Sequence, residues 1–161
     1  MLGRGVSFTS ILVIMGLLLL TGCESVKSAI GIQQSKVWLE KVTFKATANA
    51  NDSSPTKIHI VIAYKEDLAG ELGKLTATDY FKKAVKLKAD AGDELDVFAI
   101  DVVPDSSASL DITPSRSTGV IALMFARYTS PGDHRTNVGA DYEIQVLLDK
   151  KDLKVVPVKK G

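Results

Sequence analysis

The sequence contains few of the residues from which disulfides and metal centres are built. Cys23 is its only cysteine, so no disulfide can form within one chain, although export would place the chain in a compartment that permits disulfides. His59 and His134 are its only histidines, and neither has a second histidine or a cysteine at the spacing of a metal site. We therefore predict that the protein holds no metal and no cofactor.

The motifs of common enzymes are also missing. No Gly-x-Ser-x-Gly nucleophile motif is present, and Gly70 and Gly73 lack the lysine and hydroxyl residue of a phosphate-binding loop. The Asp-His-Arg segment at residues 133–135 resembles an acid–base cluster, but a solvated loop is the simpler interpretation. A paired glycosidase site could be read into four carboxylates that turn chemistry explains more simply: Asp93, Glu94, Asp96 and Asp101. We predict that the protein is not an enzyme.

Neither sign of charge is in excess. The chain has 20 basic and 19 acidic side chains. Removing residues 1–22 takes away Arg4 and no acidic residue, which leaves 139 residues with 19 side chains of each sign. A nucleic-acid-binding face would need a basic excess, so that class of protein is excluded. The remaining length is enough for one domain with its own core.

A long apolar run occurs near the start of the chain. Residues 11–20 read ILVIMGLLLL and follow Arg4; a helix of this length rises about 15 Å, roughly half the hydrocarbon thickness of a bilayer. The run is therefore typical of an export signal. The Leu-Thr-Gly-Cys that ends at Cys23 resembles a bacterial lipobox, in which the cysteine is acylated and the signal is removed. An ordinary cleaved signal and an uncleaved anchor are the alternatives.

The lipobox divides the chain into a signal peptide (1–22), a lipidated tether (23–35) and a domain (36–161). Glu24 follows the cysteine, at a position where aspartate is associated with retention in the inner membrane. We therefore predict that lipid on Cys23 anchors the domain to the periplasmic face of the outer membrane.

Short segments of alternating hydrophobicity fill the domain. We predict strands within residues 36–48, 57–65, 95–103, 108–112, 120–128, 142–148 and 153–158. One short amphipathic helix, capped by Thr78, is predicted over residues 78–87. Trp38 is interpreted as a packing anchor. Seven to eight strands with one inserted helix predict an all-β fold, a two-sheet β-sandwich.

Two polar connections are longer than strand turns require. Residues 49–56 read NANDSSPT, a composition that favours turns, and residues 129–139 form the second connection. Because tight hairpins suffice to join strands, we predict that residues 49–56 form a contact loop.

Four stretches in this order resemble the outer-membrane lipoproteins of type VI secretion systems, the TssJ (SciN) family: NANDSSPTKIHIVIAYK, TDYFKKAV, VVPDSS and GVIALMFARY. The places of the family's motifs are occupied by Ser54, Pro55, Tyr64, Pro104 and residues 119–127. The chain departs from the family pattern at Asp105, where glycine is frequent, at Ala126, which separates Phe125 from Arg127, and at residues 133–135, where a tryptophan–arginine pair is usual.

The resemblance implies a transthyretin-like sandwich with an added helix. It also implies a tethering role, in which the lipoprotein holds the trans-envelope complex of the secretion machine at the outer membrane. In the family, the loop after the first strand contacts the periplasmic part of an inner-membrane TssM-type protein. The corresponding residues of this chain are Asn49, Asn51, Asp52, Ser53, Ser54 and Pro55.

The sequence thus leaves two functions in view. The first is a non-enzymatic, lipid-anchored adaptor that binds a periplasmic partner through its loops, with oligomerisation inside the complex left open. The alternative is a periplasmic lipoprotein that binds a small ligand or a cell-wall fragment, which would need a concave apolar pocket with a few convergent polar groups.

Overall fold

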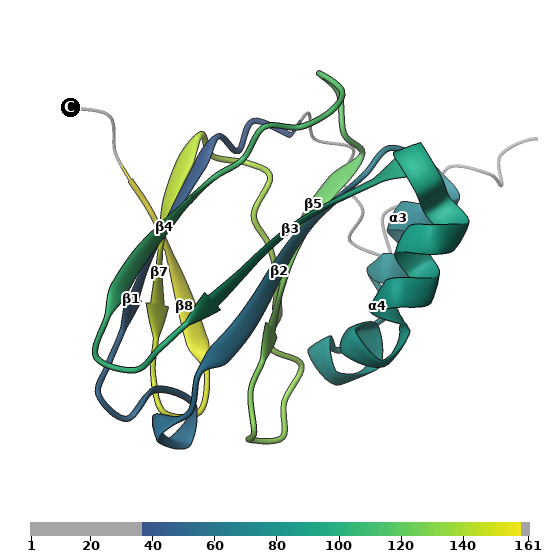
Figure 1. The fold of residues 1–161 in the computed structure, drawn as a ribbon. Helices are drawn as coiled ribbons and strands as arrows, with labels where there is room; N and C mark the ends of the chain where they lie inside the picture. The colour runs from purple at the N-terminus through teal and green to yellow at the C-terminus, as the bar shows by residue number, and fades with distance from the viewer. Residues whose placement is uncertain (1–36, 159–161) are drawn as a thin grey trace, which may run out of the picture. The chain divides into compact units, whose positions relative to one another are not determined.

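The computed structural model describes residues 37–158, which form a β-sandwich with helices on one side (Figure 1). The predicted signal peptide, Cys23 and the tether lie outside the described residues. Neither α-helix of the described part has the length and hydrophobicity that crossing a bilayer requires.

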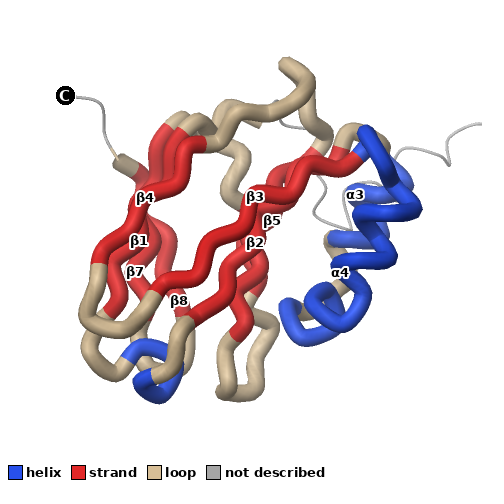
Figure 2. Tube along the Cα trace, in the orientation of Figure 1, coloured by secondary structure: helices blue, strands red, loops and turns tan. Residues whose placement is uncertain are grey.

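Eight strands of the described part form two four-stranded sheets (Figure 2). One sheet has the order β4 (Ser107–Asp111), β1 (Lys41–Ala46), β7 (Glu143–Leu148) and β8 (Leu153–Pro157). The other has the order β3 (Leu95–Val102), β2 (Thr56–Ala63), β5 (Ile121–Arg127) and β6 (Arg135–Asn137). β1 and β7 run parallel, and the other neighbouring pairs are antiparallel. The predicted two-sheet, all-β sandwich is confirmed.

The main core lies between the two sheets and follows the period-two alternation of the strands. β1 turns Val42 and Phe44 inward, and β2 turns Ile58, Ile60 and Ile62 inward; all five side chains are fully buried. Each such side chain contributes about 1.5–3 kcal/mol by leaving water. The alternation read from the sequence therefore sets which face of each strand points into the sandwich.

A second core fills the space between the outer face of the β3-β2-β5-β6 sheet and the helices. β5 serves both cores, which explains why its sequence is continuously apolar. Its inward residues are Ala122, Met124 and Ala126, and its helix-facing residues are Ile121, Leu123 and Phe125.

Two helices, α3 (Glu66–Leu72) and α4 (Ala77–Ala91), cover that outer face (Figure 1). The predicted helix is confirmed as α4, but it is longer and it begins earlier than predicted. Thr76, not Thr78, is its N-cap, because the Thr76 hydroxyl accepts a hydrogen bond from the amide of Asp79 at 3.1 Å. The Thr76 hydroxyl also donates to the Asp79 carboxylate at 3.0 Å, which adds a second contact within the first turn.

Two elements of the structure, α3 and β6, are not predicted by the sequence pattern. α3 has seven residues and carries Gly70 in its middle, so the side that buries Ala69 and Leu72 is too short to show a helical period. β6 has three residues, which lie inside the connection predicted to be a polar loop. Both elements are stabilised by tertiary packing rather than by local propensity.

An aromatic cluster joins α4 to the sheet. Nδ1 of His59, on β2, lies 3.0 Å from the hydroxyl of Tyr80, on α4. The Tyr80 ring stacks on Phe125 of β5, with centroids 4.1 Å apart and planes inclined by 7°. His59 is therefore a packing residue that connects the two layers.

The free energy of unfolding should decrease as the pH falls below the ordinary histidine pKa of 6.5. Burial and the charge of Lys57 hold the pKa of His59 below that value, against the opposing effect of Asp101. The unfolded chain therefore takes up a proton before the folded chain does, and acid favours unfolding. We expect a loss of less than about 1 kcal/mol, because water still reaches the half-buried ring. Urea unfolding across this range should show the slope in the wild type and a smaller one in His59→Leu; equal slopes would contradict the assignment.

Candidate functional site

Four connections gather at one end of the sandwich, which we call the loop pole: residues 47–55, 103–106, 128–134 and 149–152 (Figure 1). Backbone hydrogen bonds join the first connection to the second and to the fourth, and side-chain hydrogen bonds join the third to the first and the fourth. The amide of Asp105 donates to the carbonyl of Thr47, and the amide of Asn51 donates to the carbonyl of Asp149, both at 3.1 Å. The connection predicted to bind a partner is therefore one part of a larger, internally bonded surface.

Asn51 holds the first connection in place from inside. It is 2% exposed, and its Nδ2 donates to the carbonyls of Pro55 at 3.1 Å and Arg127 at 3.3 Å. Its Oδ1 accepts from the amide of Thr129 at 2.7 Å and from the Thr129 hydroxyl at 3.2 Å. A carboxamide offers two donors and an acceptor on one short side chain, which this set of neighbours requires. Asn51 is a positioning residue for the loop.

The backbone is left-handed over three residues, beginning at Asn51. The φ angles of Asn51, Asp52 and Ser53, within η1 (Ala50–Ser53), are 48°, 52° and 61°. This region is unfavourable for residues with a Cβ, and asparagine and aspartate tolerate it best. Strained backbone of this kind is concentrated at ligand clamps and switch regions, where the surroundings hold it in place. Here it leaves Asp52 and Ser53 exposed at the tip.

The predicted partner-binding residues divide into two groups. Asn49, Asp52, Ser53 and Pro55 are exposed, and Ser54 is half-buried, so a partner can reach these five. The side chain of Asn51 lies inside the loop. The candidate contact surface is therefore the left-handed tip and its flanks, and Asn51 supports it from below.

His134 ties the third connection to the fourth. Its Nδ1 lies 3.1 Å from the Asp152 carboxylate and its Nε2 lies 2.9 Å from the carbonyl of Ser130. Its ring stacks on Tyr128 at 4.7 Å, and the Tyr128 hydroxyl donates to the Asp152 carbonyl at 2.9 Å. Because His134 is 7% exposed, the solvated loop predicted for residues 133–135 is wrong at this position.

Arg135 turns instead toward the connection between the two helices. Its Nη1 donates to the carbonyls of Gly73 and, at 3.0 Å, Leu75, while its Nη2 lies 3.2 Å from the Asp133 carboxylate. Asp133 and Arg135 thus pair with each other, whereas His134 turns toward Asp152, so the three side chains do not form a shared acid–base site.

The carboxylates near the start of β3 stabilise the end of the sandwich opposite the loop pole. Glu94 pairs with Arg116 through hydrogen bonds of 2.8 and 3.2 Å. Asp96 accepts from the Tyr64 hydroxyl at 2.5 Å and from the Ser115 amide at 2.7 Å. Burial alone would raise the pKa of Asp96, but these hydrogen bonds outweigh it and hold the pKa below its ordinary value. Asp93 and Asp101 are exposed, so the four carboxylates do not form one site.

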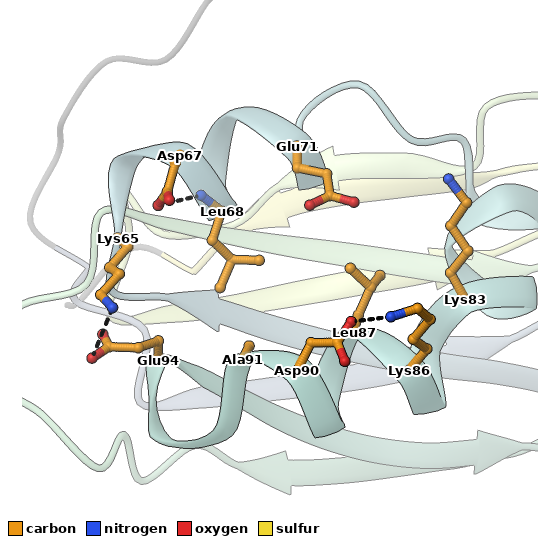
Figure 3. Close-up of a pocket in the computed structure, with 10 residues that line it drawn as sticks. All are labelled: Lys65, Asp67, Leu68, Glu71, Lys83, Lys86, Leu87, Asp90, Ala91 and Glu94. Atoms are coloured by element: carbon orange, nitrogen blue, oxygen red, sulfur yellow. Dashed lines mark hydrogen bonds and ion pairs between the residues drawn. The ribbon is translucent and has the colours of Figure 1, made fainter.

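An open groove of about 540 Å³ runs between α3 and α4 (Figure 3). Leu68 and Leu87 point toward one another between the helices, and charged side chains of both signs surround them. Lys65 lies 3.6 Å from Glu94, and Lys86 pairs with Asp90. Four of the seven charged side chains that line the groove are paired in this way, and the Asp67 carboxylate accepts from the amide of Leu68.

A second open hollow, of about 490 Å³, lies at the loop pole beside the left-handed tip. Pro55 and Ser54 border it, together with Lys57, Asp101 and Arg127 from the adjoining strands. Charged groups of both signs beside an exposed, bonded loop suit a polar contact with another protein. Within residues 37–158, no three histidine, cysteine or carboxylate side chains gather closely enough to hold a metal ion.

The sequence does not identify the residues to which Asn51 and His134 bond. Tyr128 and Thr129 follow a strand that is recognisable, and Asp152 lies in a recognisable turn, but their partners are far away in the chain. The carboxamide of Asn51 reaches Thr129 across 78 positions. An asparagine two residues after Asn49, followed by Asp-Ser-Ser-Pro, carries no signal for such a distant contact.

Comparisons with known proteins bear on the fold. No protein-family model matches the chain, and no curated protein matches it. The crystal structure of the type VI secretion lipoprotein TssJ1 from Pseudomonas aeruginosa superposes with a TM-score of 0.56 at 14% identity, covering 79% of this chain and 100% of that one. Serratia marcescens Lip, a membrane-bound component of the type VI secretion system, gives 0.51 at 14% identity, covering 75% and 97%.

A structure described as the C-terminal domain of the type VI secretion protein TssM, from EAEC, gives a TM-score of 0.53 at 13% identity and covers 74% of this chain and 98% of that one. At such identities the likeness bears on architecture, and it agrees with the resemblance found in the sequence. The chain has the β-sandwich fold of the TssJ-type lipoproteins of type VI secretion systems.

Proposed function

We propose that this protein is a TssJ-like, lipid-anchored adaptor of a type VI secretion membrane complex. Lipid on Cys23 fixes the domain to the periplasmic face of the outer membrane, and the loop pole binds the periplasmic domain of a TssM-like inner-membrane component. The lipobox and the shared fold support the proposal. A similar structure described as the TssM C-terminal domain supports the choice of partner.

The observation that carries the proposal is the placement of the two ends. The described chain starts at Val37, and β1 runs from that end directly into the left-handed tip. The extended chain from Trp38 to Thr47 spans roughly 30 Å at about 3.3 Å per residue. A domain held by its N-terminus therefore presents the tip at the far end of the sandwich, which is the arrangement that a bridge between two membranes needs.

The backbone of the left-handed tip is also held rigidly, which favours binding to a partner. Asn51 and the bonds between the four connections fix the backbone before a partner arrives, so little conformational freedom remains to be lost on binding. Asp52 lies 3.8 Å from Lys150 and 3.3 Å from the Thr129 hydroxyl, both weak and exposed contacts that a partner's basic side chain can replace.

Cross-linking from the tip tests this assignment. A photoreactive amino acid in place of Asp52, in the full acylated chain expressed in its host, should give an adduct with a large inner-membrane protein. The same amino acid in place of Asp93, exposed at the other end of the domain, should not. In a second arm, Asp52→Lys should lower co-purification of that protein at least about tenfold, since like charges across a contact repel. Equal adducts from both positions would remove the loop pole from the interface.

A further inference from the structure

The end of the sandwich opposite the loop pole exposes a pair of aromatic side chains. Trp38 and Tyr142 are 40% and 43% exposed, and their ring centroids lie 5.4 Å apart with planes inclined by 38°. Trp38, interpreted from the sequence as a packing anchor, packs against Tyr142 at the surface rather than inside a core.

The extended chain around Trp38 directs its ring outward. Val37 and Leu39 are buried on either side of Trp38, so the alternation of an extended chain leaves Trp38 on the outer side. The amide of Glu40 donates to the carbonyl of Tyr142 at 2.8 Å, which holds the two segments together. The pair is presented by bonded backbone and not by a loose loop.

The apolar surface at this end extends beyond the two rings. Val158 is 43% exposed, and its amide donates to the carbonyl of Glu143 at 3.2 Å, which places its backbone beside the residue that follows Tyr142. Three of the six large apolar residues that the described part exposes are thus Trp38, Tyr142 and Val158. We call these three residues the aromatic end.

We propose that the aromatic end lies on the phospholipid surface of the membrane in which Cys23 is anchored. The inference rests on the proposed lipid anchor. Residues 24–36 can span at most roughly 50 Å even when fully extended, so the anchor holds the aromatic end close to the bilayer. Tethering raises the effective concentration to the millimolar range, where a weak surface contact is populated. Tryptophan and tyrosine favour the headgroup region, because their rings are apolar with one polar group.

The charges near the aromatic end indicate which lipids it contacts. Glu40 and Glu143 are its neighbours in sequence and in space, and Lys41 is paired in register with Glu143. Lys36, Lys159 and Lys160 also adjoin it in the sequence, so the aromatic end has no excess of one charge to attract anionic headgroups, and the proposed contact is with zwitterionic phospholipid. It should therefore be insensitive to added salt.

Trp38 is the only tryptophan of the chain, which makes its fluorescence a direct probe. We expect the full acylated protein, reconstituted in vesicles of phosphatidylcholine and phosphatidylethanolamine, to show blue-shifted emission and at least twofold less quenching by iodide than the unacylated Cys23→Ser protein in buffer. Phospholipids brominated near the headgroup should quench Trp38 at least twofold more than phospholipids brominated at the chain end. Equal iodide quenching with no bromolipid quenching, in protein that co-floats with the vesicles, would overturn the proposal.

Two variants and two further observations distinguish the lipid contact from self-association of the chain and from loss of the lipid anchor. Tyr142→Ser should restore part of the iodide quenching, whereas Val85→Ser, at an 88% exposed position on α4, should not change it. Concentration-dependent protection of Trp38 without vesicles would assign the aromatic end to a second copy of the chain and overturn the lipid contact. Failure of the acylated protein to co-float would instead contradict the anchor, and cross-linking from Asp52 reports on the loop pole independently of both.

Discussion

Replacing Asn51 by alanine is expected to destabilise the domain by about 3–5 kcal/mol. The change removes both Nδ2 hydrogen bonds and both Oδ1 hydrogen bonds, which are partly buried and which connect the loop to Arg127 and Thr129. Alanine must also adopt a φ of 48°, which costs roughly 1–2 kcal/mol. Because a domain of this size has only about 5–15 kcal/mol of stability in total, the midpoint of urea unfolding should fall markedly.

Two further substitutions divide this loss into its causes. Asn51→Gly removes the same hydrogen bonds but tolerates the left-handed backbone, so it should be less damaging than Asn51→Ala by roughly 1 kcal/mol. Asp52→Ala places alanine at a φ of 52° but removes only weak, exposed contacts, so it should cost the backbone part alone, roughly 1–2 kcal/mol. If Asn51→Ala and Asp52→Ala unfold at the same urea concentration, Asn51 is not the residue that positions the loop.

The strands are predictable because their signal is local. The alternation of Ile58, Ile60 and Ile62 with Val61 and Ala63 already identifies β2 as a strand with two buried faces, and the structure gives it a core on each side. In this strand the pattern and the packing express one physical cause, burial of apolar surface at a fixed period.

The interior of the loop pole is not predictable in this way. Asn51 and His134 look like polar loop residues, and both are buried, because their hydrogen-bond partners come from segments that the sheet topology brings together. The Asp152 partner of His134 lies 18 positions away, and the Thr129 partner of Asn51 lies 78 positions away. A single sequence indicates that a loop is long and polar, but the fold decides which of its residues face a partner and which face the loop itself.

Replacing Cys23 by serine is expected to move the protein from the membrane fraction to the soluble periplasmic fraction, with at least a tenfold drop in the membrane-bound share. The proposed acylation at Cys23 would supply about 0.8 kcal/mol for each buried methylene, and several chains together would give stable attachment. The aromatic end cannot replace this attachment, because its contact depends on the concentration that the tether provides. Cell fractionation with detection of the protein measures the shift, and unfolding of the serine variant should match the wild type. A serine variant that remains with the membranes would exclude the lipid anchor.

Glu24→Asp separates attachment from location. Aspartate after the acylated cysteine should leave the protein lipidated but retained in the inner membrane, which density-gradient separation of the two membranes detects. The loop pole is unchanged in this variant, so cross-linking from Asp52 to the inner-membrane partner can persist when the two proteins share one membrane. Secretion should nevertheless fail, since the complex then has no attachment to the outer membrane. Full secretion from an inner-membrane protein would show that binding alone is the function, whereas loss of secretion with binding retained assigns the function to the bridge between Cys23 and the loop pole.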